Sequence, residues 1–371
     1  MKHLTGILAA LCLFASFAPT GFADSPALSR DQVTAAVRDI RQITSPNGIE
    51  ELKAIEIGGI SQWISIRGRS RDNPLLLFLH GGPASTDMPV SWAFQTPWED
   101  YFTVVQWDQR GAGKTYLAND PAKVGSTIDA ERLIGDTEAL IQWLRATYDK
   151  PKVFLLGHSW GSILGLEVAR RHPDYLYAYI GMGQIVNMME SEKLGFEWVS
   201  REAAARHDGT AVAELRAIAP YPKADGSISI DQLDVQRKWS VRYGGLTLGR
   251  TAFDYYERAA ALSPEYSPDE LAAVDKGSAL SLPRLWPDMM KADFSSLTEL
   301  KCPIIIFNGR HDETTSAEVT ARWFEKLRAP HKKLVWFENS AHMIHIEEPG
   351  RVLVHLVNDA LPLSRPGRKA N

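Results

Sequence analysis

Residues 153–171 read VFLLGHSWGSILGLEVARR, and this stretch decides the fold. An apolar run, Val153–Leu156, leads into the pentapeptide GHSWG at 157–161, and a helix-compatible run, Ser162–Ala169, follows it. No other G-x-S-x-G occurs in the chain. A buried strand, a glycine-flanked turn and a helix together lift a serine hydroxyl out of a sheet. The pattern therefore predicts Ser159 as a nucleophile, and the competing interpretation is an ordinary tight turn.

The rest of the chain agrees with a strand at this position. From about residue 50, β-type runs alternate with helical patterns, which indicates an α/β fold with a mostly parallel sheet and helices on both faces. The predicted strands are Trp63–Arg67, Leu75–Leu79, Thr103–Trp107, Val153–Leu156, Ala178–Met182, Pro303–Phe307 and Lys333–Phe337. The predicted helices are Thr127–Tyr148 with Thr127 as N-cap, Gly161–Arg171, Ala317–Leu327 and Gly350–Leu361.

The alternation of strands and helices stops between residues 184 and 293, where only helical patterns occur. An all-helical block between two strands predicts a cap over the site. We therefore expect a core of residues 24–183 and 294–363, a helical cap at 184–293, and a disordered polar tail at 364–371. The aromatic and methionine side chains of the cap are expected to pack a small core rather than to contact substrate.

A serine nucleophile needs a base and an acid that orients the base, and in such folds they follow the serine in the order acid, then histidine. The first predicted strand after the cap runs into a loop with Asp312, the predicted acid, and His311 and Glu313 are its competitors. The next strand leads to His342, the predicted base, and His345 is the alternative.

Acyl transfer also needs donors for an oxyanion. The backbone N–H of Trp160 is the first predicted donor, because Trp160 follows the nucleophile. The second is assigned to Gly82 in His80-Gly81-Gly82-Pro83, since adjacent glycines let backbone N–H groups approach a substrate. A plain Gly-Gly-Pro turn is the alternative interpretation.

A second glycine-rich turn, Asp108–Gly113, also follows a predicted strand. It lacks the lysine and hydroxyl pair of a phosphate-binding loop. We therefore interpret it as structural, with Arg110 bracing neighbouring loops through hydrogen bonds.

The N-terminus reads as a signal peptide of residues 1–23, with an apolar run at Ile7–Ala18 and cleavage after Ala23. Pro19 ends the run too early for a membrane span, so no stable anchor is expected after cleavage, and a lipoprotein reading of Cys12 is weaker. The protein is then exported, periplasmic or secreted. Cys302 remains as the lone cysteine and is expected to be a small buried apolar residue.

Composition excludes several classes of function. The formal charge of −4 gives no reason to expect a nucleic-acid partner. No zinc-type Cys/His spacing, phosphate loop or dinucleotide fingerprint is present, so neither a metal nor a cofactor is predicted. The expected partner is a small molecule or a short peptide, and the sequence does not specify an oligomeric state.

The motifs together resemble the α/β-hydrolase superfamily, and more narrowly its proline iminopeptidase branch (peptidase family S33). The segments that carry the likeness are HGGP at 80–83, WDQRGAG at 107–113, GHSWGS at 157–162, GRHD at 309–312 and SAHMIHIEEP at 340–349. The resemblance implies an eight-stranded sheet, a helical cap between the sixth and seventh strands, no cofactor, and Ser159, Asp312 and His342 as the triad.

Departures from the branch leave the substrate open. Ala84 and Thr115 replace residues common in it, and Trp239 is followed by Ser240 where the resemblance implies a glutamate that holds the substrate amine. Other cap glutamates can be nominated by composition only: Glu190, Glu192, Glu197 and Glu257. The sequence predicts a serine hydrolase acting through an acyl-enzyme on a small ester, lactone, amide or N-terminal residue. A proline iminopeptidase is the narrower alternative, and an inactive binding protein is the remote one.

Overall fold

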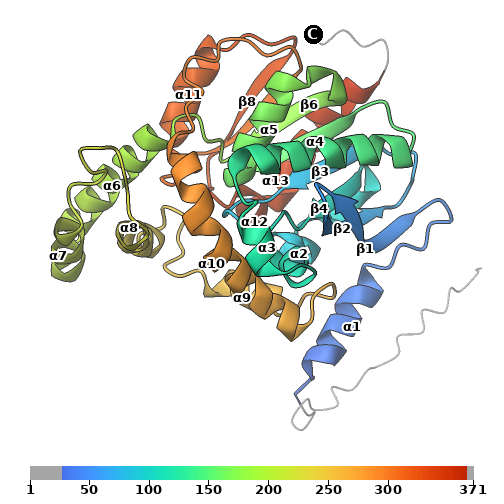
Figure 1. The fold of residues 1–371 in the computed structure, drawn as a ribbon, viewed down its shortest axis with the longest axis horizontal. Coiled ribbons are helices and arrows are strands. Elements are labelled where there is room, and N and C mark those ends of the chain that lie inside the picture. The colour runs from blue at the N-terminus through green and yellow to red at the C-terminus, as the bar shows by residue number, and fades with distance from the viewer. Residues whose placement is uncertain (1–26, 366–371) are drawn as a thin grey trace, which may run out of the picture.

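The computed structural model describes residues 27–365 of the 371-residue chain. The predicted signal peptide and residues 366–371 of the predicted tail lie outside this range. An eight-stranded sheet forms the centre, in the order β1-β2-β4-β3-β5-β6-β7-β8 (Figure 1). β2 pairs antiparallel with β1 and β4, and every other pairing is parallel. The strands are β1 Ile49–Ile57, β2 Ile60–Gly68, β3 Leu75–Leu79, β4 Thr103–Trp107, β5 Val153–His158, β6 Leu176–Met182, β7 Ile304–Gly309 and β8 Lys332–Phe337.

β3 shows why the apolar runs become central strands. Its side chains alternate between two hydrophobic clusters on opposite faces of the sheet: Leu75, Leu77 and Leu79 join one, and Leu76 and Phe78 the other. Successive strand residues point to opposite faces, so a strand covered on both sides needs an unbroken apolar run. β5 and β7 alternate in the same way.

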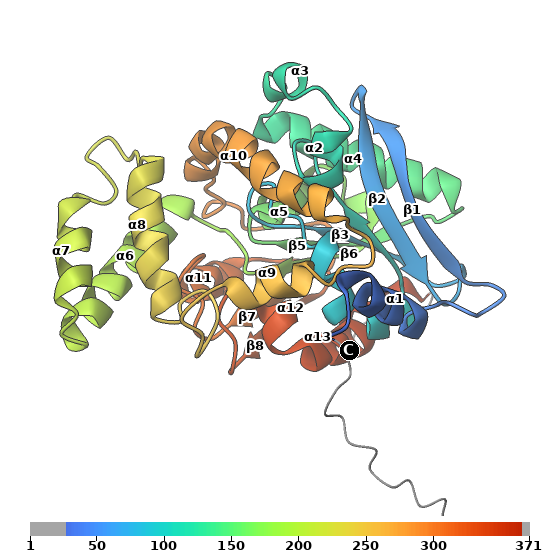
Figure 2. The ribbon, with the colours of Figure 1, turned by 90° about the horizontal axis from the view of Figure 1, so that it is seen from below.

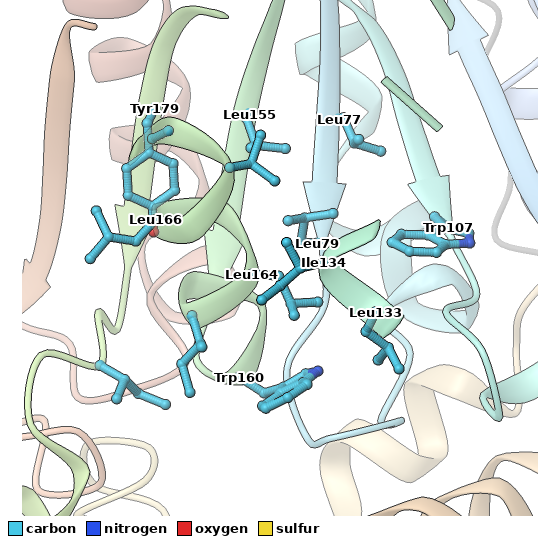
Figure 3. Close-up of a cluster of buried hydrophobic side chains, with 14 of the residues drawn as sticks. Leu77, Leu79, Trp107, Leu133, Ile134, Leu155, Trp160, Leu164, Leu166 and Tyr179 are labelled. Carbon is cyan, nitrogen blue, oxygen red and sulfur yellow. The ribbon is translucent and has the colours of Figure 1, made fainter. Parts of the chain in front are cut away.

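Helices cover both faces of the sheet. On one face α4 (Ala130–Thr147), α5 (Trp160–Arg171) and α11 (Ala317–Lys326) supply the first cluster. Figure 3 shows side chains of α4 and α5 meeting the leucines of β3 and β5. On the other face lie η1 Met88–Ala93, η2 Thr96–Asp100, α12 Ile344–Glu347, α13 Pro349–His355 and a π-helical turn Leu356–Ala360. The shorter helices α1 Arg30–Ile40, α2 Gly113–Leu117, α3 Pro121–Gly125 and the 3-10 turn Pro173–Tyr175 complete the core.

Between β6 and β7 the chain forms a helical insertion, as predicted, and we call it the cap. It comprises α6 Met188–Ala205, α7 Gly209–Ala217, α8 Ile230–Arg242, α9 Asp254–Ala260 and α10 Pro268–Met290. Figures 1 and 2 show α9 and α10 crossing the edge of the sheet where the parallel strands end. Trp239 packs with Val199, Ala203 and Leu215 in a separate small core of the cap, as expected. Met188, Trp286 and Met289 pack as well, but they join the main cluster beside the sheet and not a small core of the cap.

Three details correct the sequence-based predictions. β1 was missed, because between its two buried ends exposed residues alternate with partly buried ones in place of an apolar run. The N-cap of α4 is Asp129, whose carboxylate accepts from the Arg132 N–H, and not Thr127. The predicted helix 350–361 is three segments in turn: α13, the π-helical turn and a 3-10 helix, Leu361–Ser364, so that Ser364 is helical and not part of a disordered tail.

A smaller expectation concerns the burial of Cys302. Cys302 is buried and free, as predicted. Among residues 27–365, no helix combines the length and the apolar character needed to cross a bilayer.

Candidate active site

Ser159 occupies a strained turn between β5 and α5. Its φ of +53° is rare for a residue with a Cβ atom and costs about 1–3 kcal/mol. Glycines on both sides make the turn possible. A Cβ on Gly157 would lie 2.5 Å from the Gly161 carbonyl oxygen, and a Cβ on Gly161 would lie 2.2 Å from that of Leu79. The two glycines of the motif are therefore steric requirements of the bend.

Backbone hydrogen bonds hold this turn in place. The Ser159 N–H donates to the Met182 carbonyl at 3.0 Å. The Ser159 carbonyl accepts from the N–H and the hydroxyl of Ser162 at 2.8 and 2.6 Å. These bonds tie the turn to the end of β6 and to the first turn of α5, so that the surrounding structure sustains the strain.

His342 and Asp312 form a buried pair at the ends of β8 and β7. His342 Nδ1 lies 2.8 Å from Asp312 Oδ2. The carboxylate also accepts from the Thr314 and Thr315 N–H groups at 2.8 and 3.0 Å, and from the Thr315 hydroxyl at 2.8 Å. Burial would raise the pKa of Asp312, but His342 and these donors outweigh burial and lower the pKa to about 2. An ionised carboxylate only accepts, so Nδ1 carries the proton and Nε2 has the free lone pair.

The geometry separates the predicted acid and base from their competitors. His311 is exposed, and Glu313 makes no contact with His342 among the hydrogen bonds and ion pairs of residues 27–365. Burial, followed by the charge of Asp312, raises the pKa of Glu313 to about 7. His345 is buried and contacts Asp87 Oδ1 at 3.3 Å. Of these residues only Asp312 and His342 pair with each other.

Ser159 and His342 line one pocket of about 730 Å³ between the sheet edge and the cap, together with Gly81 and Gly82. In the described part of the chain no hydrogen bond joins the Ser159 hydroxyl to His342. Such contacts often tighten only when substrate binds. The structure therefore places the predicted nucleophile and base on the walls of a single cavity.

The two predicted oxyanion donors are both unpaired. Trp160 is the first residue of α5, and Gly82 lines the pocket with a φ of +109°. Neither backbone N–H has an acceptor within residues 27–365. A Cβ on Gly81 would lie 3.0 Å from the Ser159 Cβ, which shows how closely the glycine loop approaches the nucleophile.

Comparison with known proteins agrees with this geometry. The family described as alpha/beta hydrolase fold matches residues 74–349. The chain belongs to the α/β-hydrolase fold family. A probable aminopeptidase of Bacillus subtilis, YbaC, is 34% identical over 83% of this chain and 95% of its own length. A proline iminopeptidase of Heyndrickxia coagulans is 24% identical over 75% and 87% respectively.

Solved structures agree on the fold. The proline iminopeptidase of Mycobacterium smegmatis superposes with a TM-score of 0.59, at 17% identity, over 85% of this chain and 99% of that one. The resemblance inferred from the motifs is thereby confirmed, down to the eight strands and the helical insertion.

In this α/β hydrolase, Arg110 has the structural role that its motif predicted. The guanidinium is buried and donates to both Asp136 oxygens, at 2.8 and 3.1 Å. It also donates to Thr127 Oγ1 and to the Gly58 carbonyl, both at 2.9 Å. Three loops are held together by one side chain.

The four cap glutamates nominated for an amine site are dispersed. Glu190 is only partly buried and pairs with Arg322, and Glu197 is exposed. Glu192 is fully buried and already paired with Arg237 and the Tyr221 hydroxyl. Glu257 lines the pocket, but its side chain is exposed to solvent. None of the four is a buried, unpaired carboxylate.

The sequence reasoning missed a buried group beside the nucleophile, formed by Asp87, His158 and His345. One potential ligand atom from each lies within 4.8 Å of the others. Asp87 and His158 also line the pocket. Asp87 lies seven residues beyond His80 on an irregular loop, and nothing in its local sequence marks it as special.

Proposed function

We propose that this α/β hydrolase is a serine aminopeptidase that releases the N-terminal residue of short peptides or aminoacyl amides. The buried Asp312–His342 pair carries the proposal, because its imidazole lines the pocket that also holds Ser159. A hydroxyl on a strained turn beside an oriented imidazole is the arrangement that acyl transfer requires.

The chemistry follows from the positions of these groups. His342 Nε2 takes the proton of Ser159, whose oxygen attacks the substrate carbonyl carbon. The N–H groups of Gly82 and Trp160 donate to the oxyanion that forms, and Asp312 stabilises the imidazolium. His342 then protonates the departing amine, and later takes a proton from the water that hydrolyses the acyl-enzyme.

Aminopeptidase activity is favoured over general esterase activity by the relatives. The B. subtilis protein named a probable aminopeptidase overlaps nearly its whole length with this chain. With the predicted signal peptide, we propose that the enzyme acts in the periplasm or outside the cell, on peptide fragments rather than folded proteins.

A substrate panel tests the proposal. Alanyl, leucyl and prolyl p-nitroanilides with free amines are compared with their N-acetyl forms, and with short acyl esters and lactones. We expect the free-amine amides to have the highest kcat/KM. A preference for N-acetyl amides, esters or lactones would refute the aminopeptidase and leave the serine hydrolase.

A fluorophosphonate probe tests the chemistry itself. We expect wild type and Ser85→Ala, which alters another pocket serine, to be labelled, and Ser159→Ala to lose both labelling and turnover. Absence of labelling in the wild type would instead indicate a binding protein that kept the fold.

A further inference from the structure

Asp87 and His158 bring two hydrogen-bond acceptors together in the wall of the active-site pocket. Asp87 Oδ2 lies 4.0 Å from His158 Nδ1, and both residues line the cavity that holds Ser159. Each atom is without a donor in the described chain, and the reason differs for the two residues.

The Asp87 carboxylate is only half satisfied. Oδ1 accepts from the Tyr256 hydroxyl at 2.7 Å and lies 3.3 Å from His345 Nε2. Oδ2 accepts no hydrogen bond from residues 27–365, because the contacts of this carboxylate with Tyr256 and His345 both go to Oδ1. Burial would raise the pKa of Asp87, but His345, His158 and Tyr256 outweigh burial and lower the pKa to about 2. A charged oxygen in the wall of the cavity therefore has no hydrogen-bond donor among these residues.

His158 cannot supply the missing proton. Its Nε2 lies 3.1 Å from the His342 carbonyl oxygen, which can only accept, so Nε2 carries the hydrogen. Burial, together with the neighbouring histidines, lowers the pKa of His158 to about 3, so the ring is neutral. Nδ1 is therefore a buried lone pair without a donor. A buried acceptor left unpaired costs about 1–3 kcal/mol.

The separation of the two acceptors fits an ammonium better than a metal ion. At a hydrogen-bond length of about 2.9 Å, one nitrogen bridging acceptors 4.0 Å apart makes an angle of roughly 90°, within reach of tetrahedral N–H directions. A zinc ion at about 2.1 Å from each atom would need roughly 145°, far from tetrahedral. An ammonium also brings a positive charge to the ionised carboxylate.

The acceptor pair lies beside the nucleophile. A Cβ on Gly81 would lie 3.0 Å from the Ser159 Cβ and 3.4 Å from His158 Nδ1, so the same glycine borders both. The α-nitrogen of an amino acid is two bonds from the carbonyl carbon that Ser159 attacks. A substrate that presents its carbonyl to Ser159 therefore carries its α-ammonium close to this pair.

We propose that Asp87 Oδ2 and His158 Nδ1 form the subsite that binds the α-ammonium group of the substrate. This inference rests on the proposed aminopeptidase function, and it identifies the residues that would select substrates with a free α-ammonium group. Glu257 and Asp275 line the same pocket but are exposed, so water screens their charges. Arg237, the pocket cation, is neutralised by Glu192.

A matched pair of substrates isolates the ammonium. Alanine p-nitrophenyl ester and p-nitrophenyl propionate differ only in the amine, so the ratio of their kcat/KM values measures its recognition. We expect Asp87→Asn to lower kcat/KM for the alanine ester at least 30-fold and for the propionate less than threefold. The control, Asp275→Asn, removes an exposed pocket carboxylate and should keep the wild-type ratio.

The outcomes separate the two proposals. If the wild type does not favour the amine, the proposed function fails. If the wild type favours it and Asp87→Asn keeps that preference, or loses both activities in parallel, only the subsite is refuted. If a chelator abolished the preference of the wild type for the alanine ester, the cluster of Asp87, His158 and His345 would be a metal site. The proposed ammonium subsite would then also be refuted.

An inhibition measurement on the wild type tests the subsite without requiring that the Asp87→Asn variant folds. Propylammonium and propan-1-ol have the same number of heavy atoms and differ in charge. We expect propylammonium to inhibit propionate ester hydrolysis competitively at least tenfold more strongly than propan-1-ol. Equal inhibition by the two would contradict an ammonium subsite.

Discussion

The rings of His158 and His342 lie against each other, with centroids 4.9 Å apart and planes 38° apart, and His158 Nε2 donates to the His342 backbone carbonyl at 3.1 Å. His158 precedes Ser159 and lies 184 positions before His342 in the chain. The turn that carries the nucleophile and the loop that carries the base are therefore joined directly. His158 is a positioning residue for the base as well as an acceptor for substrate.

Removing the hydrogen bond between His158 and His342 should lower kcat without weakening substrate binding. We expect His158→Phe to lower kcat for a neutral ester about 5- to 10-fold, the equivalent of one hydrogen bond. KM for that ester should change little, and His158→Gln, whose amide N–H can still donate, should recover part of kcat. Equal losses in both variants would show that ring packing, and not the hydrogen bond, matters.

The carboxylate behind His342 should be decisive for catalysis. In Asp312→Asn an amide replaces the acceptor of the Nδ1 proton, so the imidazole loses both its orientation and its preferred tautomer, and kcat is expected to fall by roughly 10³–10⁴. Glu313→Gln is the control, because it changes the adjacent carboxyl group, which does not touch His342. The measurement is kcat at pH 7.5. Comparable losses in the two variants would count against Asp312 as the orienting acid.

Glycine substitutions test the steric basis of the nucleophile turn. In Gly161→Ala the new Cβ would lie 2.2 Å from the Leu79 carbonyl oxygen and 2.7 Å from that of His80. Because both are backbone atoms, we expect a loss of about 3 kcal/mol or more in the free energy of unfolding. Gly135→Ala lies on the exposed face of α4 with nothing within 4 Å, and it should gain about 0.5–1 kcal/mol. Urea titrations of both variants measure the free energy of unfolding. A stable and active Gly161→Ala variant would disprove the steric argument.

The sequence predicted those features of the fold and the site that neighbouring residues in the chain mark. The central strands β3, β4, β5 and β7 were recognised because two-sided burial demands continuous apolar residues. β1, an edge strand with alternating burial, has no such run, and its glutamates, lysine, leucine and alanine also suit a helix. Asp312 and His342 could be proposed because each comes soon after a predicted strand and the order along the chain is characteristic.

Asp87 could not be found in the same way. Its partners Tyr256 and His345 lie 169 and 258 residues further along the chain. No periodicity or spacing links such positions, and only the folded cap brings Tyr256 to the loop. The amine-binding residue was sought on the cap by family resemblance, whereas the unpaired carboxylate lies on the core.

Acid should weaken the protein partly through Asp312. Its pKa is about 2 in the folded state, below the roughly 3.9 of an unfolded aspartate, so its stabilisation is complete above about pH 5 and is lost as pH falls through 4 toward 2. The contribution is on the order of 2 kcal/mol, and about half of it should be gone at pH 3. The stability advantage of wild type over Asp312→Asn, measured by urea unfolding, should therefore shrink between pH 5 and pH 3. A constant difference would mean that Asp312 titrates normally in the folded protein.

The cap should depend on one buried ion pair. Glu192 is fully buried, donors from Arg237 and Tyr221 meet its carboxylate, and Arg237 reaches the pocket from α8. Glu192→Gln leaves the guanidinium without its counter-charge in a partly desolvated position, so we expect a loss of about 2–4 kcal/mol in the free energy of unfolding.

Glu190→Gln is a matched control two residues away, because its ion pair with Arg322 is exposed and should be worth less than about 1 kcal/mol. The freed charge of Arg237 should also act on substrate. Since it would repel an α-ammonium entering the same pocket, KM for alanine p-nitrophenyl ester should rise in Glu192→Gln while KM for the propionate ester stays close to wild type. If both KM values rose together, the pair would serve only the packing of the cap, and its charge would have no part in selecting the substrate.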